Sequence, residues 1–396
     1  MPFYHALGSM PRKRHTVFRR PDGGLYAEEL MGHEGFVGTS SLLYHTYPPT
    51  TIKSARKLRD VKWEADDETS LRHRHFRTAR ATKGGSATLD RAPLLFNSDI
   101  AMLYVEPDTN DSHFYRNSQA DEVVYVIEGQ GVLESVYGDL PYKPGDYVVL
   151  HRNILHRWRL DLEVANKFLV MESRGHVRVP RRYMNDVGQL LEGAPYCERD
   201  IRRPTELHPH DEKGDFPLLV KQYDAINELV LDHHPFDVVG WDGYFYPWAF
   251  SIHDFEPIVG RIHQPPPVHQ TFQGDGFVIC SFCPRPYDFD PNAVPAPYNH
   301  SNVDSDEVLF YASSEFMSRK GIEYGSITHH PDGLPHGPHP GRTEASIGAK
   351  YTNELAVMMD SFKPLKVAKP AMEIEDPTYH LSWIEQQHAQ FNPPTS

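Results

Sequence analysis

The chain has 396 residues, of which 39% are hydrophobic, and its formal net charge is −14. This composition excludes wholesale disorder, and the acidic balance excludes a general nucleic-acid binder, because phosphate binding needs a basic surface. No apolar run reaches the ~18 to 20 residues of a membrane helix, and no apolar stretch of the secretory type follows the basic residues near the start. The three cysteines cannot form a disulfide framework, so we expect a cytoplasmic protein.

The predicted elements change in character along the first half of the chain. Residues 1–95 are rich in turn signals and predict an irregular N-terminal extension. A core follows at about 98–175, where short β-branched and aromatic runs predict strands at 100–105, 122–127, 131–136, 146–150 and 166–171. Regularly spaced short strands are typical of an antiparallel sandwich or barrel.

In the second half of the chain, strand-like runs appear again after a linking segment. Residues 180–235 are polar and rich in Pro, and they predict a linking segment with one short helix near 223–231. Strand-like runs resume at 244–250, 277–282, 308–311 and 355–359. We therefore expect an all-β fold with an N-terminal domain at 1–240 and a C-terminal domain at 241–396.

An internal repeat relates the two domains. In each, an Asn stands five residues before a Glu that opens an apolar run, and the pairs are Asn117–Glu122 and Asn302–Glu307. Further on, each has a His eleven residues after a Gly, and these pairs are Gly145–His156 and Gly325–His336. Two matches in the same order predict two copies of one β-domain.

These segments resemble the two motifs of the cupin fold. The second copy carries the second motif intact, as Gly325, Pro331, Gly333 and His336. It carries the first motif as His300 and Glu307, with Asn302 in the place of the second His. The first copy keeps Glu122 and His156 but has Tyr115 in place of the first His. The resemblance implies two cupin-type barrels, and we expect the first to be a structural half.

His300, Glu307 and His336 together predict a metal site. A pure strand would place His300 and Glu307 on opposite faces, because their separation is odd, so the residues between them must bend. Two imidazoles and one carboxylate leave open coordination positions, as in the facial triad of non-haem Fe(II) oxygenases. The alternative is a metal-free bicupin in which both histidines are structural turn residues.

The chain resembles the homogentisate 1,2-dioxygenases along nearly its whole length, most clearly in the runs 24–32, 260–272 and 298–307. The resemblance implies Fe(II) on His300, Glu307 and His336. It also implies ring cleavage of homogentisate by O2, which gives maleylacetoacetate in tyrosine and phenylalanine breakdown. The expected partners are then a small aromatic acid and O2, with no nucleic acid and no membrane, and we expect a homo-oligomer.

The resemblance further implies catalytic histidines. His330 stands six residues before the last ligand, where family members carry an active-site His. The proton acceptor of the family lies upstream of the first ligand, and His253 is the best match, with His269 and His263 as competitors. Two other functions stay open: a cupin dioxygenase that acts on gentisate or a related aromatic acid, and a non-catalytic bicupin that binds a small molecule.

Two further clusters are interpreted as structural. Cys280 and Cys283 lack a second pair of cysteines, so we expect buried thiols rather than a zinc site. His73 and His75 stand in a basic stretch without a nearby carboxylate, and we expect them at the surface.

Overall fold

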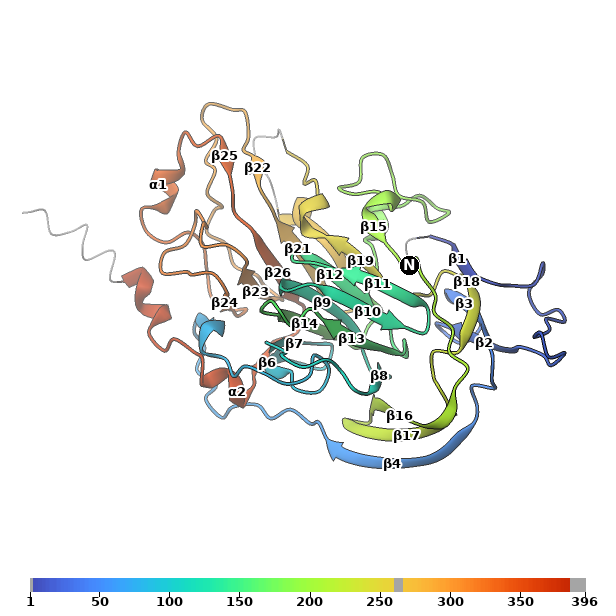
Figure 1. Cartoon of the computed structure of the whole chain (residues 1–396). Helices are drawn as coiled ribbons and strands as arrows, with labels where there is room; N and C mark the ends of the chain where they lie inside the picture. Colours follow the sequence, from blue (N-terminus) through green and yellow to red (C-terminus); the bar gives the residue numbers. More distant parts are fainter. Residues whose placement is uncertain (1–2, 260–265, 385–396) are drawn as a thin grey trace, which may run out of the picture. The chain divides into compact units, whose positions relative to one another are not determined.

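The structure is a computed structural model that describes residues 3–259 and 266–384 (Figure 1). The chain forms two compact units. Unit 1 comprises residues 1–63, 83–91 and 103–254, and unit 2 comprises residues 64–82, 92–102 and 255–396. This division differs from the predicted domains 1–240 and 241–396, because the chain enters unit 2 for the last time after residue 254 and because two earlier segments also belong to unit 2.

Unit 1 consists of strands in layers. Its strands are β1 (His5–Gly8), β2 (Ala27–Gly32), β3 (Ser40–His45), β4 (Ile52–Asp60), β8 (Phe114–Asn117), β9 (Asp121–Glu128), β10 (Gly131–Ser135), β11 (Gly138–Tyr142), β12 (Asp146–Leu150), β13 (His156–Leu160), β14 (Lys167–Ser173), β15 (Ile201–Arg202), β16 (Lys213–Gln222), β17 (Ala225–His233), β18 (Val238–Gly243) and β19 (Trp248–Ser251). Their neighbours follow the orders β1-β18-β3-β2, β11-β10-β13-β8-β16-β17-β4 and β15-β19-β12-β9-β14. Most pairings are antiparallel, and β16 runs parallel to β8.

The core of unit 1 lies between two of these layers. Strands β9 and β12 are buried along almost their whole length, so their sequences read as continuous apolar runs rather than as an alternation. Between the layers, the ring of Trp158 on β13 lies 5.0 Å from the ring of Phe168 on β14. Tyr142 on β11 lies 5.0 Å from the same Trp158. This is the sandwich that the strand spacing predicts.

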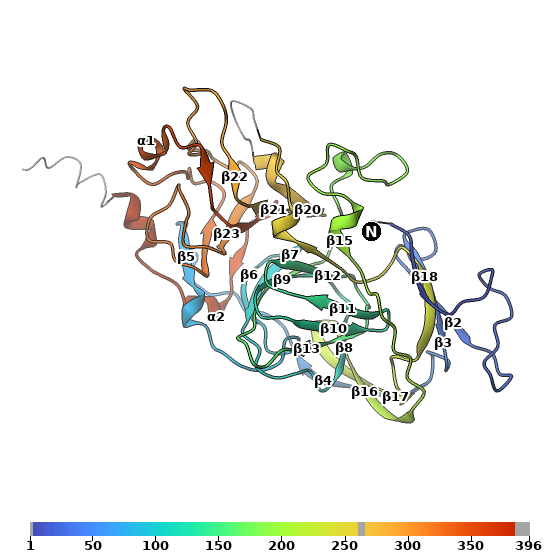
Figure 2. The ribbon, with the colours of Figure 1, turned by 45° about the horizontal axis from the view of Figure 1, so that its top comes forward.

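Unit 2 is built around one six-stranded sheet. Its elements are β5 (Arg74–Arg77), β6 (Ala92–Phe96), β20 (Gln270–Gly274), β21 (Phe277–Phe282), β22 (Arg285–Pro286), β23 (Asp306–Tyr311), β24 (Ser326–His330), α1 (Arg342–Ser346), β25 (Tyr351–Thr352), β26 (Ala356–Ser361), β27 (Lys366–Val367) and α2 (Lys369–Met372). The sheet order is β20-β21-β26-β23-β24-β5. Figure 2 shows the light-blue β5 among the orange strands of this unit, because β5 pairs with β24.

The remaining elements are short helices and one strand in which the chain passes from one unit to the other. Strand β7 (Ile100–Val105) contains one passage from unit 2 to unit 1. Short 3-10 helices lie at Thr78–Arg80, Arg181–Tyr183, Glu198–Asp200, Ile252–Asp254, Pro266–His269 and Tyr379–Leu381.

Two segments that we expected to be irregular contain strands. Residues 1–95 carry β1 to β6, and β4 was not predicted because its sequence IKSARKLRD is exposed at every position and shows no apolar alternation. The predicted helix near 223–231 is wrong, since this segment forms β17 and pairs with both β16 and β4. Tyr223 and Asp224 both have positive φ, at 56° and 52°, and make the tight turn that joins β16 to β17.

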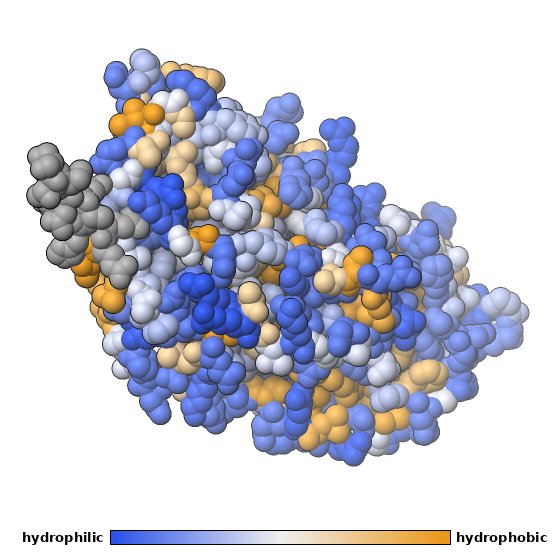
Figure 3. All heavy atoms as spheres, turned by 60° about the vertical axis from the view of Figure 1, so that its left-hand side comes forward, coloured by the Kyte–Doolittle hydropathy of each residue, from blue (hydrophilic) through white to orange (hydrophobic). Residues whose placement is uncertain are grey.

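The surface agrees with the charged composition. Hydrophilic side chains cover most of the face in Figure 3, and the apolar areas between them are small. In the described part of the chain, no helix is both long enough and apolar enough to cross a membrane.

Candidate metal centre

The three predicted metal ligands meet where β23 of unit 2 begins. Each offers one ligand atom, and these atoms lie within 4.8 Å of one another. Nε2 of His300 is 3.7 Å from Oε2 of Glu307, and Nε2 of His336 is 3.5 Å from Oε1 of the same carboxylate. One ion between them would therefore contact all three side chains.

Backbone hydrogen bonds hold the two histidines side by side. The N–H of His300 donates to the C=O of His336 at 2.8 Å, and the N–H of His336 donates to the C=O of His300 at 2.9 Å. This approach needs glycine at position 337, because a Cβ there would lie 2.8 Å from the Cα of Asn299. The His-Gly-Pro run thus positions a ligand by steric means.

The segment between His300 and Glu307 bends, as its odd length requires. The chain turns at residues 303–304, and regular strand begins only at Asp306. Strand β23 then pairs with β24 so that Glu307 stands opposite His330. The two side chains therefore lie on the same face of the sheet.

The charges at this site suit a cation. Burial alone raises the pKa of Glu307, but its contacts with His300, His330 and His336 outweigh burial and hold that pKa well below its usual range. The contact with Glu307 likewise raises the pKa of His300 against the opposing effect of burial. Glu307 is thus ionised at neutral pH, which is the form that binds metal.

Three buried polar atoms around Glu307 have no hydrogen-bond partner among the residues that the structure describes. They are Nε2 of His330, Nε2 of His336 and Oδ1 of Asp360. Asp360 stands opposite Glu307 in the register of β23 and β26, and burial, followed by the charge of Glu307, raises the pKa of Asp360 to about 8. Unpaired buried polar groups cost free energy, and a divalent cation at this point would offset that cost. The donor set therefore fits a metal ion.

Unit 1 also has two buried carboxylates close together, and there a guanidinium group lies beside them. Glu122 and Glu172 stand opposite each other on β9 and β14, as Glu307 and Asp360 do in unit 2. Nη1 of the buried Arg91 lies 2.9 Å from Oε1 of Glu122 and 3.6 Å from Oε1 of Glu172. A cation of the chain therefore takes the corresponding place in unit 1, which supports a structural role for the first copy.

A second group of possible metal ligands in unit 1 is satisfied by hydrogen bonds. Asp121, His151 and His176 also bring ligand atoms within 4.8 Å. Both histidines bond through Nδ1 to Oδ2 of Asp121, at 2.8 and 3.0 Å, and the N–H of Val177 donates to the same oxygen. Nε1–H of Trp248 donates to Nε2 of His151 at 3.3 Å. Both nitrogens of His151 are thus engaged, and we assign this group a structural role.

Of the two predicted catalytic histidines, His330 lies at the triad in unit 2, and His253 belongs to unit 1. Nδ1 of His330 is 2.8 Å from Oε1 of Glu307, and its ring stacks on His336 with centroids 4.8 Å apart. His253 lies exposed in unit 1, with its ring against Gly145. His253 therefore belongs to unit 1 and the triad to unit 2, and the catalytic role of His253 stays a prediction.

The two other histidines considered as proton acceptors, His269 and His263, differ in what the structure shows of them. His269 is buried in unit 2 and stacks on Phe282 with centroids 4.4 Å apart. His263 lies outside the described residues. Cys280 and Cys283 are buried thiols that form no disulfide bond in the described part of the chain, as predicted.

His73 belongs to the surroundings of the triad, although its sequence context predicted a surface position. Its ring lies 5.3 Å from that of His330 and 6.2 Å from that of His336. His73 is half-buried, and its neighbour His75 is buried and bonds through Nε2 to Ser326 at 2.8 Å, a residue 251 positions away. The expectation failed because β5 joins the sheet of unit 2, and no local pattern reveals such a distant pairing.

Comparisons with known proteins show the family of the chain. A sequence profile for the N-terminal part of homogentisate 1,2-dioxygenase matches residues 6–252. The chain belongs to the homogentisate 1,2-dioxygenase family. It is 42% identical, over 97% of its length, to a Saccharolobus solfataricus protein that is provisionally named a dioxygenase, and it covers 99% of that protein. It is 27% identical to the homogentisate 1,2-dioxygenase of Nitrobacter hamburgensis, over 92% of this chain and 86% of that one.

Solved structures of cupin proteins are also similar. The cupin 2 conserved barrel domain protein of Leptotrichia buccalis is 11% identical, with a TM-score of 0.33, over 77% of this chain and 100% of that chain. The strand pairings themselves establish the predicted all-β fold, which here is divided into two units.

Proposed function

We propose that this protein is an Fe(II)-dependent ring-cleaving dioxygenase that converts homogentisate and O2 to maleylacetoacetate. The observation that carries the proposal is the cluster of His300, Glu307 and His336 in a chain of the homogentisate 1,2-dioxygenase family. Two imidazoles and one carboxylate with open positions are typical of non-haem Fe(II) oxygenases. Iron, when bound, supplies Lewis acidity toward a ring hydroxyl and redox chemistry with dioxygen.

His330 has the free lone pair that a proton acceptor needs. Glu307 is ionised and can only accept, so the hydrogen bond between them assigns the proton of His330 to Nδ1. Nε2 then carries the lone pair, and this atom is buried without a hydrogen-bond partner in the described part of the chain. We assign His330 the role of taking the proton of a substrate hydroxyl.

Arg319 is the candidate partner of the substrate carboxylate. Its side chain is buried in unit 2, and its Nη1 donates to the C=O of Gly337, the residue after His336. No ion pair joins Arg319 to a carboxylate among the residues that the structure describes, and its Nε has no hydrogen-bond partner. Burial lowers the pKa of Arg319, but Tyr311, Tyr379 and Glu307 outweigh burial and raise it, so the guanidinium stays charged. It can therefore bind the carboxylate of an aromatic acid in a bidentate pair.

Oxygen uptake by the iron-loaded chain tests the proposal. Homogentisate should consume O2 and give a new ultraviolet absorbance, and 3-hydroxyphenylacetate, which keeps one hydroxyl of homogentisate and lacks the other, should not. Glu307→Gln should abolish uptake, and Glu315→Gln, which changes an exposed carboxylate of the same unit, should leave it unchanged. Uptake with gentisate alone would favour the other aromatic-acid dioxygenase, and no uptake with any of these acids would favour a non-catalytic bicupin.

A further inference from the structure

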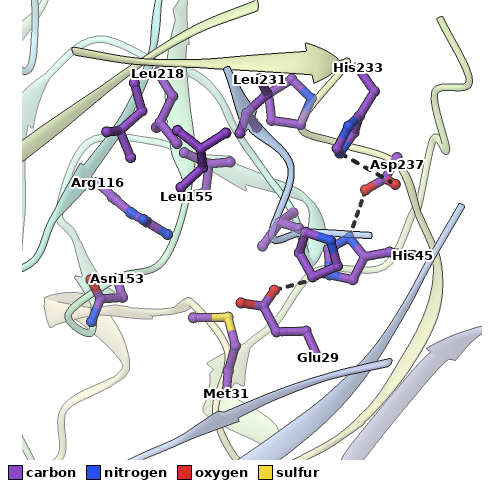
Figure 4. Close-up of a pocket in the computed structure, with 15 residues that line it drawn as sticks. Glu29, Met31, His45, Arg116, Asn153, Leu155, Leu218, Leu231, His233 and Asp237 are labelled. Carbon is purple, nitrogen blue, oxygen red and sulfur yellow. Dashed lines mark hydrogen bonds and ion pairs between the residues drawn. The ribbon is translucent and has the colours of Figure 1, made fainter. Parts of the chain in front are cut away.

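A pocket within unit 1 combines apolar walls with the guanidinium group of an arginine (Figure 4). Leu155, Leu218 and Leu231 line one side of it, from the segment before β13 and from strands β16 and β17. Glu29, on β2, and Arg116, on β8, lie among the polar groups of the lining. The pocket therefore offers an apolar surface next to charged groups.

The two carboxylates of the pocket are already paired. Nδ1 of His45 is 2.7 Å from Oδ1 of Asp237, and Nε2 of His45 is 3.0 Å from Oε2 of Glu29, as the dashed lines in Figure 4 show. Burial by itself lowers the pKa of His45, but these two contacts outweigh burial and raise it to about 9. The imidazolium thus holds both carboxylates at neutral pH, and Glu29 is committed to His45 rather than to Arg116.

Arg116 is left without such a partner. Its neighbours on β8, Tyr115 and Asn117, are buried on the opposite face of the strand, so the alternation of β8 turns Arg116 toward the pocket. Nε of Arg116 is buried without a hydrogen-bond partner, and no ion pair joins its guanidinium to a carboxylate in the described part of the chain. Burial lowers the pKa of Arg116, and the charge of Glu29 opposes this effect.

We propose that this pocket binds a small monocarboxylic acid with an apolar body. The carboxylate pairs with Arg116, since a guanidinium group binds a carboxylate through two parallel hydrogen bonds. The apolar body lies against Leu155, Leu218 and Leu231. A cationic ligand is disfavoured because Glu29 is already paired with His45, and a second negative charge is disfavoured because Glu29 stands nearby. The proposal is independent of the reaction assigned to unit 2.

Crystals of the full chain grown with 4-bromophenylacetate provide the direct test. Anomalous scattering locates the bromine, so a probe in the pocket of unit 1 is distinguished from one at the triad. We expect a bromine peak beside Leu218 and Leu231. Absence of a peak there at saturating probe, whether because the pocket stays empty or because a second copy of the chain covers it, would overturn the proposal.

Calorimetric titration of the same probe in solution measures the part played by the charge. Arg116→Gln should weaken binding to the unit 1 site roughly 10- to 100-fold, the usual effect of losing a charge-assisted pair, and Arg116→Lys should weaken it less. Arg56→Gln, which changes an exposed arginine on β4, should bind as the unaltered chain does. The neutral 4-bromophenylacetamide should bind as weakly as the acid binds to Arg116→Gln. Equal affinity of the acid and the amide for the unaltered chain would contradict the pairing with Arg116.

Discussion

Replacing Arg91 with Met should destabilise unit 1 strongly, because this guanidinium is the cation that unit 1 uses where unit 2 would use a metal. The Arg91 side chain is 3% exposed, and its Nη1 lies 2.9 Å from Glu122 and 3.6 Å from Glu172. At an effective dielectric constant of about 20, the first of these attractions amounts to about 6 kcal/mol, part of which offsets the cost of burying the charges. Breaking such a buried pair costs about 3–5 kcal/mol net.

Thermal unfolding measures this loss. For a domain of this size, about 3–5 kcal/mol corresponds to a fall in Tm of roughly 6–20 °C. Arg56→Met is the matched control, because Arg56 is 69% exposed and solvent screens its pair with Glu228, so its loss should hardly change the Tm. Adding Glu122→Gln to Arg91→Met should recover part of the loss, because it removes the unpaired charge. A Tm for Arg91→Met within error of that for Arg56→Met would refute the reasoning.

Four further outcomes are expected. Glu307→Gln should reduce bound iron from about one per chain to near zero, measured by elemental analysis, while circular dichroism stays unchanged; retained iron would contradict the ligand assignment. His330→Gln should keep the iron and lower turnover by ~10²–10⁴, and loss of iron would instead make His330 a ligand or its support. Arg319→Gln should raise KM for homogentisate far more than it lowers kcat, whereas an equal fall in kcat at unchanged KM would exclude a binding role. The free energy of unfolding should fall with rising pH by about 3 kcal/mol through the titration of His45, because its pKa of about 9 in the folded state exceeds the ordinary ~6.5. This stabilisation is complete below pH ~6.5 and lost above pH ~9, and denaturant titrations of His45→Gln should lack the slope.

The triad could be predicted from the sequence because its pattern is local. His300 and Glu307 flank one bend, and His336 follows a Pro-Gly turn at the end of the next strand. The spacing of these three residues in the sequence is therefore enough to predict that they form one site. The buried strands were predicted for the same reason, since strands such as β9 carry continuous apolar runs. The odd spacing from His300 to Glu307 also required the bend that the structure contains.

The surroundings of the triad could not be predicted, because they come from distant segments. His73 reaches His330 only because β5 pairs with β24, and Asp360 stands opposite Glu307 only because of the register of β26. Arg91 carries no motif, and its partner Glu122 is visible as a pair only once the fold is known. A polar edge strand such as β4 could not be predicted for a different reason. Its residues are all exposed, so its sequence shows no alternation of apolar and polar residues.

Diffraction at the iron absorption edge from crystals of the iron-loaded chain tests the central claim most directly. The claim is that one metal ion binds, in unit 2, and that unit 1 replaces it with Arg91. The account predicts a single anomalous peak between His300, Glu307 and His336. A peak beside Glu122 in unit 1, or no peak at the triad in crystals that contain iron, would contradict it.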